Sequence, residues 1–363
     1  MGFVGFLFAL AVAILLLLIP LVGVWAANLT TLFGVVIPYG AVLIFFVGLV
    51  YRVVKWGRSP VPFRIPTTCG QEKSLPWIKT NCIDNPSNNL MVVVRMALEI
   101  LTFRSLFRNT ALDFREGRAT YSSSKWLWVF ALAFHYSFLV VLIRHLRFFI
   151  GDQLVTAGGY PTLLGLIHYL EKIDGFMEVG FWPFTWLPGA MLSGLVLLGA
   201  VSLLFLRRLV IPQVRYISLA NDWFPLFLIA HIALTGIIMR YLLKVDVIGV
   251  KELALNLVNF NLKAPPEGIG TLFYMHLFNV CVLLAYFPFS KLMHAPGVFL
   301  SPTRNLANNS RAVRHINPWN DPNIKPHSYQ EYEDDFREFM VEAGLPVEKS
   351  LEEAEAESGQ SKE

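Results

Sequence analysis

The chain has 363 residues, of which 55% are hydrophobic and 15% charged, and its mean hydropathy is +0.52. A soluble domain of this size carries more charge on its surface, so the composition excludes an ordinary soluble protein and predicts one that lies in lipid. The formal net charge is +4, and the three cysteines, Cys69, Cys82 and Cys281, form no CxxC pair. An iron–sulfur cluster needs about four thiolates, so any such cluster must belong to another chain.

Six apolar segments are long enough to cross a bilayer as helices. They run over residues 3–25, 32–54, 126–149, 187–206, 223–243 and 272–292. The first segment has no basic stretch before it and is too long for a signal peptide, so it is predicted to be an uncleaved helix. The fold class expected is therefore all-α, an integral membrane helical bundle with about six transmembrane helices.

Lys and Arg gather in the segments that follow the second and fourth spans. The first of these segments carries twelve, Arg52, Lys55, Arg58, Arg64, Lys73, Lys79, Arg95, Arg104, Arg108, Arg115, Arg118 and Lys125. The second carries Arg207, Arg208 and Arg215. Basic loops face the cytoplasm, which places both termini there, as an even number of spans requires. We expect a multi-pass protein of the inner (cytoplasmic) membrane.

Four regions follow from this topology. They are an N-terminal transmembrane hairpin (1–56), a cytoplasmic basic loop (57–125), a histidine-bearing transmembrane bundle (126–294) and a cytoplasmic tail (295–363). Within the loop, residues 90–107 have apolar positions at helical spacing, which predicts an amphipathic helix on the membrane or on a partner. The tail carries an acidic cluster, Glu331, Glu333, Asp334 and Asp335.

Five of the eight histidines lie in or at the ends of the third, fifth and sixth spans: His135, His145, His231, His276 and His294. The other three, His168, His315 and His327, are expected at the surface. A polar ring inside lipid is costly and indicates function, although one histidine alone could simply hydrogen-bond a neighbouring helix. Five such rings favour b-type haem, which needs two axial imidazoles at matching depth on facing helices.

The direction of the spans places His145 and His276 toward the outer face, where they form one candidate pair. A second pair on the cytoplasmic side is expected to include His135 and His294. On ideal helices, however, the step from His135 to His145 covers about 15 Å and the step from His276 to His294 about 27 Å, so the inner pair is not matched in depth. His231 matches the depth of His135 better and remains an alternative ligand.

Two helices with histidine spacings of ten and eighteen residues resemble the gamma subunit of respiratory nitrate reductase, a family of dihaem cytochromes b. The resemblance implies two haem b groups. It assigns His135 and His294 to an inner haem iron and His145 and His276 to an outer haem iron. Under this resemblance His231 is not a ligand.

A second resemblance covers most of the chain, including its cytoplasmic segments. The stretches that carry it are RSPVPFRIPTT (58–68), ALEILTFRSLFRNT (97–110), SSKWLW (123–128), LIRHLRFF (142–149), PQVRYISL (212–219) and the region 286–309. They resemble DsrM, the cytochrome b subunits of the DsrMKJOP complexes of dissimilatory sulfur metabolism. The resemblance implies menaquinol as substrate and a cytoplasmic iron–sulfur subunit like DsrK as partner. A multihaem cytochrome c, a periplasmic iron–sulfur subunit and a second membrane subunit are further implied partners, whereas nucleic acid is not.

Charged residues near the outer pair are candidates for the quinol site. An acid or base among them would take up the quinol protons, whereas the cationic ones alternatively anchor a helix end at the interface. The first candidates are Arg144, Lys244 and Asp246, with Arg147, Lys251 and Glu252 beside them. Arg144, next to His145, is also the best candidate to pair with a haem propionate.

The basic loop and residues 301–306 are expected to form a docking surface, unless the positive-inside topology alone accounts for the Arg excess. Two other classes of function remain open. One is a haem-free transporter or proton pathway, although such folds usually bring internal repeats, which this sequence lacks. The other is a structural anchor for soluble redox subunits, which leaves the buried histidines unexplained.

Overall fold

The computed structural model describes residues 2–59, 81–115, 117–150, 163–175, 191–301, 304–308, 325 and 327–353. The chain divides into two compact units, Met1–Ser59 with Arg64–Arg311, and Pro60–Phe63 with Ala312–Glu363. The first unit is a helical bundle. The second contains the helix α13 (Tyr329–Glu342).

Six helices are long and apolar enough to span a membrane, so the expected bundle is confirmed. They are α1 (Gly2–Trp25), α2 (Ile37–Gly57), α5 (Lys125–His145), α7 (Leu192–Val210), α9 (Ala220–Tyr241) and α11 (Thr271–Tyr286). A π-helical turn, Leu32–Val36, precedes α2, and a 3-10 turn, Leu146–Phe149, follows α5. The fourth span begins at Leu192, later than expected, and residues 187–190 lie outside the described part of the chain.

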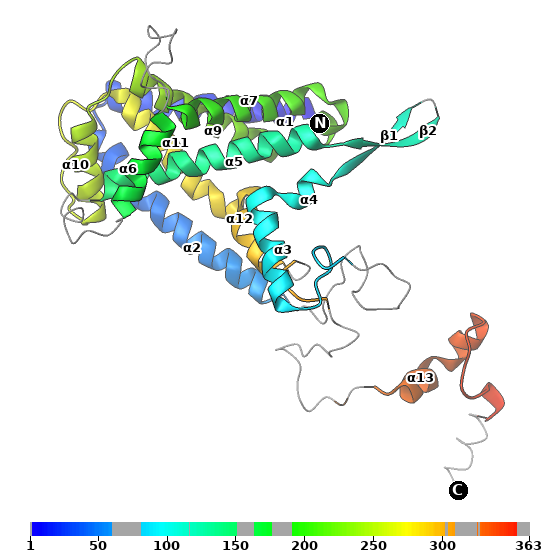
Figure 1. Cartoon of the computed structure of the whole chain (residues 1–363). Helices are drawn as coiled ribbons and strands as arrows, with labels where there is room; N and C mark the ends of the chain where they lie inside the picture. Colours follow the sequence, from blue (N-terminus) through cyan, green and yellow to red (C-terminus); the bar gives the residue numbers. More distant parts are fainter. Residues whose placement is uncertain are drawn as a thin grey trace. The chain divides into compact units, whose positions relative to one another are not determined.

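Neighbouring spans pack in a defined order. Helix α5 packs on α7, α7 on α9, α9 on α1 and α11, and α11 on α1 and α2. Figure 1 shows α1, α5, α7 and α9 running side by side. Buried Leu197 and Val201 of α7 meet Ile229 and Ala233 of α9, and Phe138 of α5 packs against this cluster. The apolar residues thus join the spans to one another as well as facing lipid.

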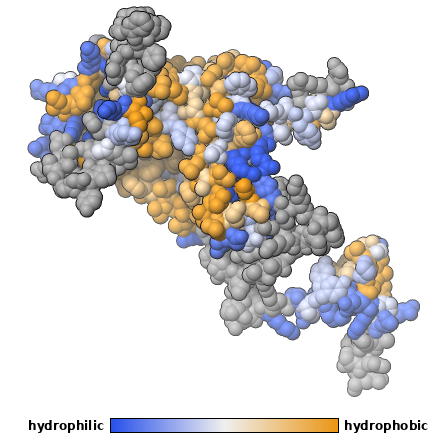
Figure 2. Space-filling view, viewed as in Figure 1, coloured by the Kyte–Doolittle hydropathy of each residue, from blue (hydrophilic) through white to orange (hydrophobic). Residues whose placement is uncertain are grey.

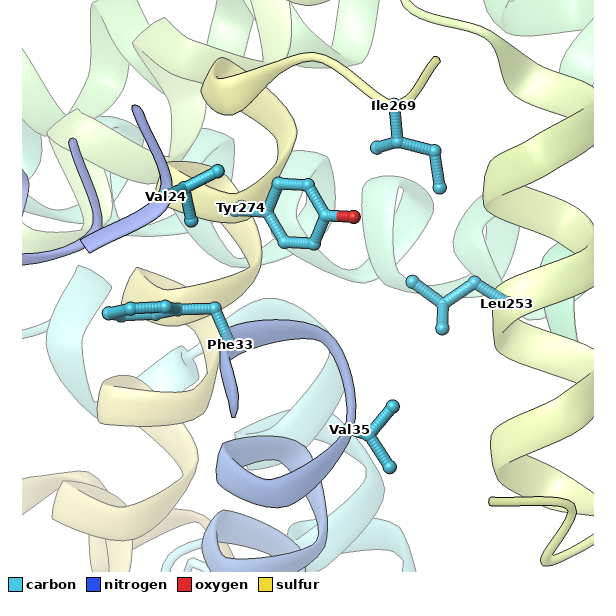
Figure 3. Close-up of a cluster of buried hydrophobic side chains, with 6 residues drawn as sticks. All are labelled: Val24, Phe33, Val35, Leu253, Ile269 and Tyr274. Atoms are coloured by element: carbon cyan, nitrogen blue, oxygen red, sulfur yellow. The ribbon is translucent and has the colours of Figure 1, made fainter. Parts of the chain in front are cut away.

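A second apolar cluster fixes the start of α11, as Figure 3 shows. It joins Val24 at the end of α1, Phe33 and Val35 of the π-helical turn, Leu253 of α10 (Val247–Val258), Ile269 and Tyr274. Tyr274 is only 1% exposed, and burying a side chain of this kind stabilises the fold by about 1.5–3 kcal/mol. Because Tyr274 lies two residues before His276, this cluster also positions that histidine.

Short elements connect the spans at both ends of the bundle (Figure 1). They are α3 (Asn89–Thr102), α4 (Arg104–Phe107), strands β1 (Thr110–Arg115) and β2 (Arg118–Ser123), α6 (Leu163–Asp174) and α8 (Pro212–Ile217). The amphipathic helix expected over 90–107 is interrupted at Phe103, whose φ of 50° is left-handed. The antiparallel hairpin β1–β2, with Leu112 opposite Tyr121, was not predicted. It extends away from the bundle in Figure 1.

Helix α3 is fixed to α5 by two hydrogen bonds between side chain and backbone. The Trp128 indole N–H donates to the carbonyl of Thr102, and the Tyr136 hydroxyl donates to that of Leu101, each at 2.7 Å. At the other end of α3, the side chain of Asn88 accepts from the backbone N–H of Met91 and caps the helix. These contacts place Phe103 beside the first histidine of α5.

Candidate functional site: two histidine pairs

The inner pair joins His135 of α5 to His294 of α12 (His294–Gly297). Their ring centroids are 5.9 Å apart and their planes lie at 83°. An uninterrupted helix from His276 to His294, which the estimate of depth assumed, does not exist, because α11 ends at Tyr286. Pro288, which has no backbone N–H, and extended Ser290 break the helix, and 3-10 turns at Phe287–Phe289 and Lys291–Met293 lead to His294.

The outer pair joins His145, the last residue of α5, to His276 in the second turn of α11. Their ring centroids are 6.4 Å apart and their planes are within 15° of parallel. The structure therefore places together the same two pairs that the nitrate reductase resemblance implied. That these rings bind haem stays a prediction.

The hydrogen bonds of the four rings leave one nitrogen of each for a metal. Nδ1 of His135 faces the carbonyl of Ala131, and Nδ1 of His145 faces that of Val141, both at 2.7 Å. Nδ1 of His294 faces the carbonyl of Lys291 at 2.9 Å. A carbonyl can only accept, so Nδ1 carries the proton in each ring and Nε2 keeps its lone pair.

In His276 a side chain, not a carbonyl, receives the hydrogen bond from Nδ1–H, so Nε2 again keeps its lone pair. The hydroxyl of Thr235 in α9 donates to the carbonyl of His231 at 2.7 Å, so its lone pair faces Nδ1 of His276 at 2.9 Å. Thr235 is a positioning residue that the sequence reasoning missed. No local pattern distinguishes it from any other threonine in an apolar helix.

The spacing of both pairs fits two imidazoles on one iron. With metal–imidazole bonds of about 2.0 Å and about 1.1 Å from nitrogen to ring centre, collinear ligands place the ring centroids about 6 Å apart. The described residues contain no group of three or more His, Cys, Asp or Glu that could hold a metal ion. Haem needs no such group, because the porphyrin supplies four ligands and the protein only two. Helix α5 packs mainly on α6 and α7, and it faces α11 through the histidine rings.

Several contacts hold the inner pair in position. Lys291, whose carbonyl faces His294, is itself bound by Asp222 of α9 through an ion pair of 2.6 Å. The rings of Phe103 and Phe134 pack edge-on against His135, with centroids 4.9 and 5.0 Å away. Gly48 of α2 is required where Pro288 approaches, because an added Cβ would lie 2.8 Å from the Cβ of that proline.

A buried polar cluster lies beside the outer pair. The guanidinium of Arg144 pairs with Asp174 of α6, and both bind Ser193 of α7. The backbone N–H of Ser193 also donates to the Asp174 carboxylate at 2.6 Å. Asp174 and Ser193, which the sequence reasoning missed, are 7% and 6% exposed. A second ion pair, Arg147 to Glu171, also ties α6 to the end of α5.

The other quinol-site candidates lie in the connection between α9 and α10. Lys244 is exposed and has a left-handed φ of 42°. Asp246 caps α10, because its carboxylate accepts from the backbone N–H of Ile248 at 3.0 Å. Asp246 therefore has a structural role as the N-cap of α10. Lys251 is half-buried on α10, and Glu252 beside it is exposed.

The remaining histidines belong to neither pair. His231 lies one turn before Thr235 on α9, and its buried Nδ1 has no hydrogen-bond partner among the described residues. His327 is exposed and lies in the second unit. The side chain of His168 and the whole of His315 lie outside the described residues.

The expected docking surface is largely engaged within the chain. Asp84 pairs with both Arg104 and Arg108, Glu99 pairs with Arg304, and Arg95 donates to the carbonyls of Asp84 and Arg304. The hydrogen bond from Arg104 is the largest cause of the lowered pKa of Asp84. Glu99 and Arg95 thus hold the loop to Arg304, whereas Arg104 and Arg108 brace the loop internally at Asp84. Reversing the charge of Arg104 and Arg108 would therefore disturb the fold before it tested docking.

A six-span helical bundle in which facing helices present two histidine pairs defines a membrane protein of the cytochrome b-like class. Residues 90–315 match the nitrate reductase gamma subunit family, and the chain belongs to that family. It is similar to the Hdr-like menaquinol oxidoreductase cytochrome b-like subunit of Archaeoglobus fulgidus, with 43% identity over 301 residues, 81% of this chain and 85% of the relative. The corresponding subunit of Archaeoglobus profundus is 39% identical over 292 residues, 79% and 82% of the two chains.

Proposed function

We propose that this chain is a dihaem b membrane cytochrome that oxidises menaquinol and passes the electrons across the membrane to a cytoplasmic iron–sulfur subunit. The two histidine pairs, one at the middle of α5 and one at its C-terminal end, are the observation that carries the proposal. Its relatives are named menaquinol oxidoreductase cytochrome b-like subunits, which supports the same substrate. Within this class we propose a DsrM-like role in dissimilatory sulfur metabolism.

The chain's own residues would bind and orient the cofactors. His135 and His294 would hold the inner haem and His145 and His276 the outer one, each through Nε2, because Nδ1 is engaged elsewhere. Haem b, when bound, supplies one-electron redox chemistry that side chains lack. Lys291, Thr235 and the aromatic rings around His135 would fix the ligand geometry.

Oxidation of menaquinol to menaquinone releases two electrons and two protons, so the site needs a group that accepts protons. Among the candidates, we favour the cluster that holds Arg144 over Lys244 and Asp246. Arg144 adjoins His145 and is held by buried Asp174, and a buried ionisable group in a membrane bundle indicates function. Asp174→Asn is expected to slow menaquinol oxidation while the haem spectrum is kept, with Glu267→Gln, an exposed acid outside the candidate set, as the control.

The direct test is a reduced-minus-oxidised spectrum of the purified chain with a pyridine haemochrome count. Two haem b per chain are expected. His145→Ala and His294→Ala should each lose a different haem, whereas His231→Ala, the control from the same bundle, should keep both. A folded preparation without haem would overturn the proposal and favour the haem-free proton pathway, which His231 with its unpaired Nδ1 would then serve.

The proposed orientation is multi-pass in the inner (cytoplasmic) membrane with both termini cytoplasmic. The proposed complex adds a multihaem cytochrome c, a periplasmic iron–sulfur subunit and a second membrane subunit. Since Arg104 and Arg108 pair with Asp84, docking of the cytoplasmic subunit is better tested at exposed Arg118. Weaker subunit association in Arg118→Glu, with unchanged haem content, would support docking. Unchanged association would favour topology as the reason for the Arg excess.

A further inference from the structure

Helix α13 forms a small, internally braced module. The side chain of Ser328 accepts from the backbone N–H of Glu331, and the Glu331 carboxylate accepts from that of Ser328, which makes a capping box. After the helix the chain turns back, and fully buried Glu333 accepts from the backbone N–H groups of Glu348 and Lys349 at 2.8 and 3.1 Å. Arg337 pairs with the same carboxylate. The helix is therefore held by contacts within its own module.

The outer face of α13 is an exposed aromatic stripe. Tyr329, Tyr332, Phe336 and Phe339 follow one another at helical spacing and are 54%, 51%, 45% and 66% exposed. Figure 2 shows apolar and strongly hydrophilic residues together on this module. Single exposed apolar residues are ordinary, but four aligned aromatic rings on one helix indicate a surface that binds something.

The surroundings of the stripe are acidic. Glu331, Asp335, Glu338 and Glu342 form a parallel row beside it, and residues 325–353 carry nine acidic against three basic side chains, a net charge of −6. Backbone N–H groups lower the pKa of Glu333, and the hydrogen bond from Arg337 lowers that of Asp334, so both stay ionised at neutral pH.

This charge argues against the membrane as the occupant of the stripe. Helices that lie in the lipid interface are rich in Lys and Arg on their polar face, and the cytoplasmic leaflet is negatively charged. A module of charge −6 is repelled by such a surface. The partner must instead combine an apolar groove for the aromatic rings with cationic side chains around it.

We propose that the aromatic stripe of α13 docks into an apolar groove, rimmed by Lys and Arg, on a soluble redox subunit. This inference rests on the proposed function and on the cytoplasmic position of the C-terminus. A preformed amphipathic helix in a groove is a recurrent mode of recognition, and aromatic side chains dominate the affinity of such interfaces. Opposite charges speed the encounter, so association should weaken as salt is raised.

A photo-crosslinking residue at position 339, with position 352 as the control, tests this in the full chain within its purified complex. Both positions are exposed, but only position 339 lies on the stripe. The expected result is a crosslink from position 339 to a peptide with apolar and basic residues in a soluble redox subunit, and none from position 352. A crosslink from position 339 to lipid, to a second copy or to the bundle of the same chain would overturn the proposal.

Substitutions on α13 test the same proposal quantitatively, through retention of the soluble subunit. Phe339→Ala and Phe336→Ala should each weaken retention of that subunit by roughly fivefold or more, whereas Glu352→Gln should leave it unchanged. Retention at the wild-type level in both Ala variants would overturn the α13 proposal. The haem content of the same preparations separates the two claims: absent haem counts against the proposed function, and haem with undiminished retention counts against α13 docking only.

Discussion

Thr235→Val isolates the contact that orients His276. The two side chains have the same shape, and Thr235 is 6% exposed, so the replacement removes the hydroxyl while it conserves packing. Nδ1 of His276 then loses the acceptor at 2.9 Å. A buried N–H without a partner costs about 1–3 kcal/mol.

For Thr235→Val, the expected cost lies at the lower end of this range of about 1–3 kcal/mol. The lost contact joins two neutral groups, and such hydrogen bonds contribute about 0.5–1.5 kcal/mol. We expect a loss of about 1–1.4 kcal/mol, which corresponds to roughly five- to tenfold weaker haem binding at the outer site. The inner site should be unaffected, because the Nδ1–H groups of its rings donate to the carbonyls of Ala131 and Lys291.

The assay is competition for haem with a haem-free acceptor protein in a His294→Ala background, where only the outer haem is expected to remain. Thr235→Ser is the matched control, since it keeps the hydroxyl. Weak haem binding in the Val variant and near wild-type binding in the Ser variant is the expected result. Equal binding in all three proteins would refute the argument that Thr235 orients the ligand.

Three further predictions concern packing, charge and pH. Gly48→Ala should lower the free energy of unfolding by about 1–3 kcal/mol and selectively weaken binding of the inner haem, because the new Cβ displaces Pro288. Gly40→Ala, which meets open space in the same helix, should do neither. The unfolding midpoint and haem retention measure the two effects. Asp174→Leu should destabilise the bundle by about 3–5 kcal/mol, because Arg144 is left buried and unpaired. Adding Arg144→Met to the same chain should restore much of the lost stability, and thermal unfolding of both variants measures this. The folded-state pKa of Asp84 lies below its ordinary 3.8, so its contribution to stability is present above that value and lost as pH falls through the lowered pKa. The protection factors of the amides in residues 81–108 should therefore fall in acid in the wild type, whereas in Asp84→Asn they should be lowered already at neutral pH and show no such acid step.

Much of the architecture follows from local composition. An apolar run of about twenty residues can satisfy its backbone in lipid only as a helix, which is why the six spans could be predicted and lie close to their expected bounds. The histidines could be selected for the same reason, because an imidazole inside an apolar run stands out. Family membership followed from motifs that adjoin these spans and is confirmed by the comparison with known proteins.

The extrapolation of an ideal helix past Tyr286 gave a wrong depth for His294. Pro288 was visible in the sequence, but the direction of the chain after it depends on contacts with other elements. Gly48 of α2 receives the proline, and Asp222 of α9 binds Lys291. These contacts lie more than sixty residues apart in the chain, and no periodicity along one helix contains them.

The sequence by itself determined that the chain spans a membrane six times and that a few histidines in those spans are the residues to examine. Only the tertiary structure decided how the chain after Tyr286 brings His294 to His135, that Thr235 orients His276, and that Arg144 is bound by Asp174 and Ser193. The physical reason is that burial in lipid is a property of each segment, whereas a ligand pair or a buried ion pair depends on the packing of several segments.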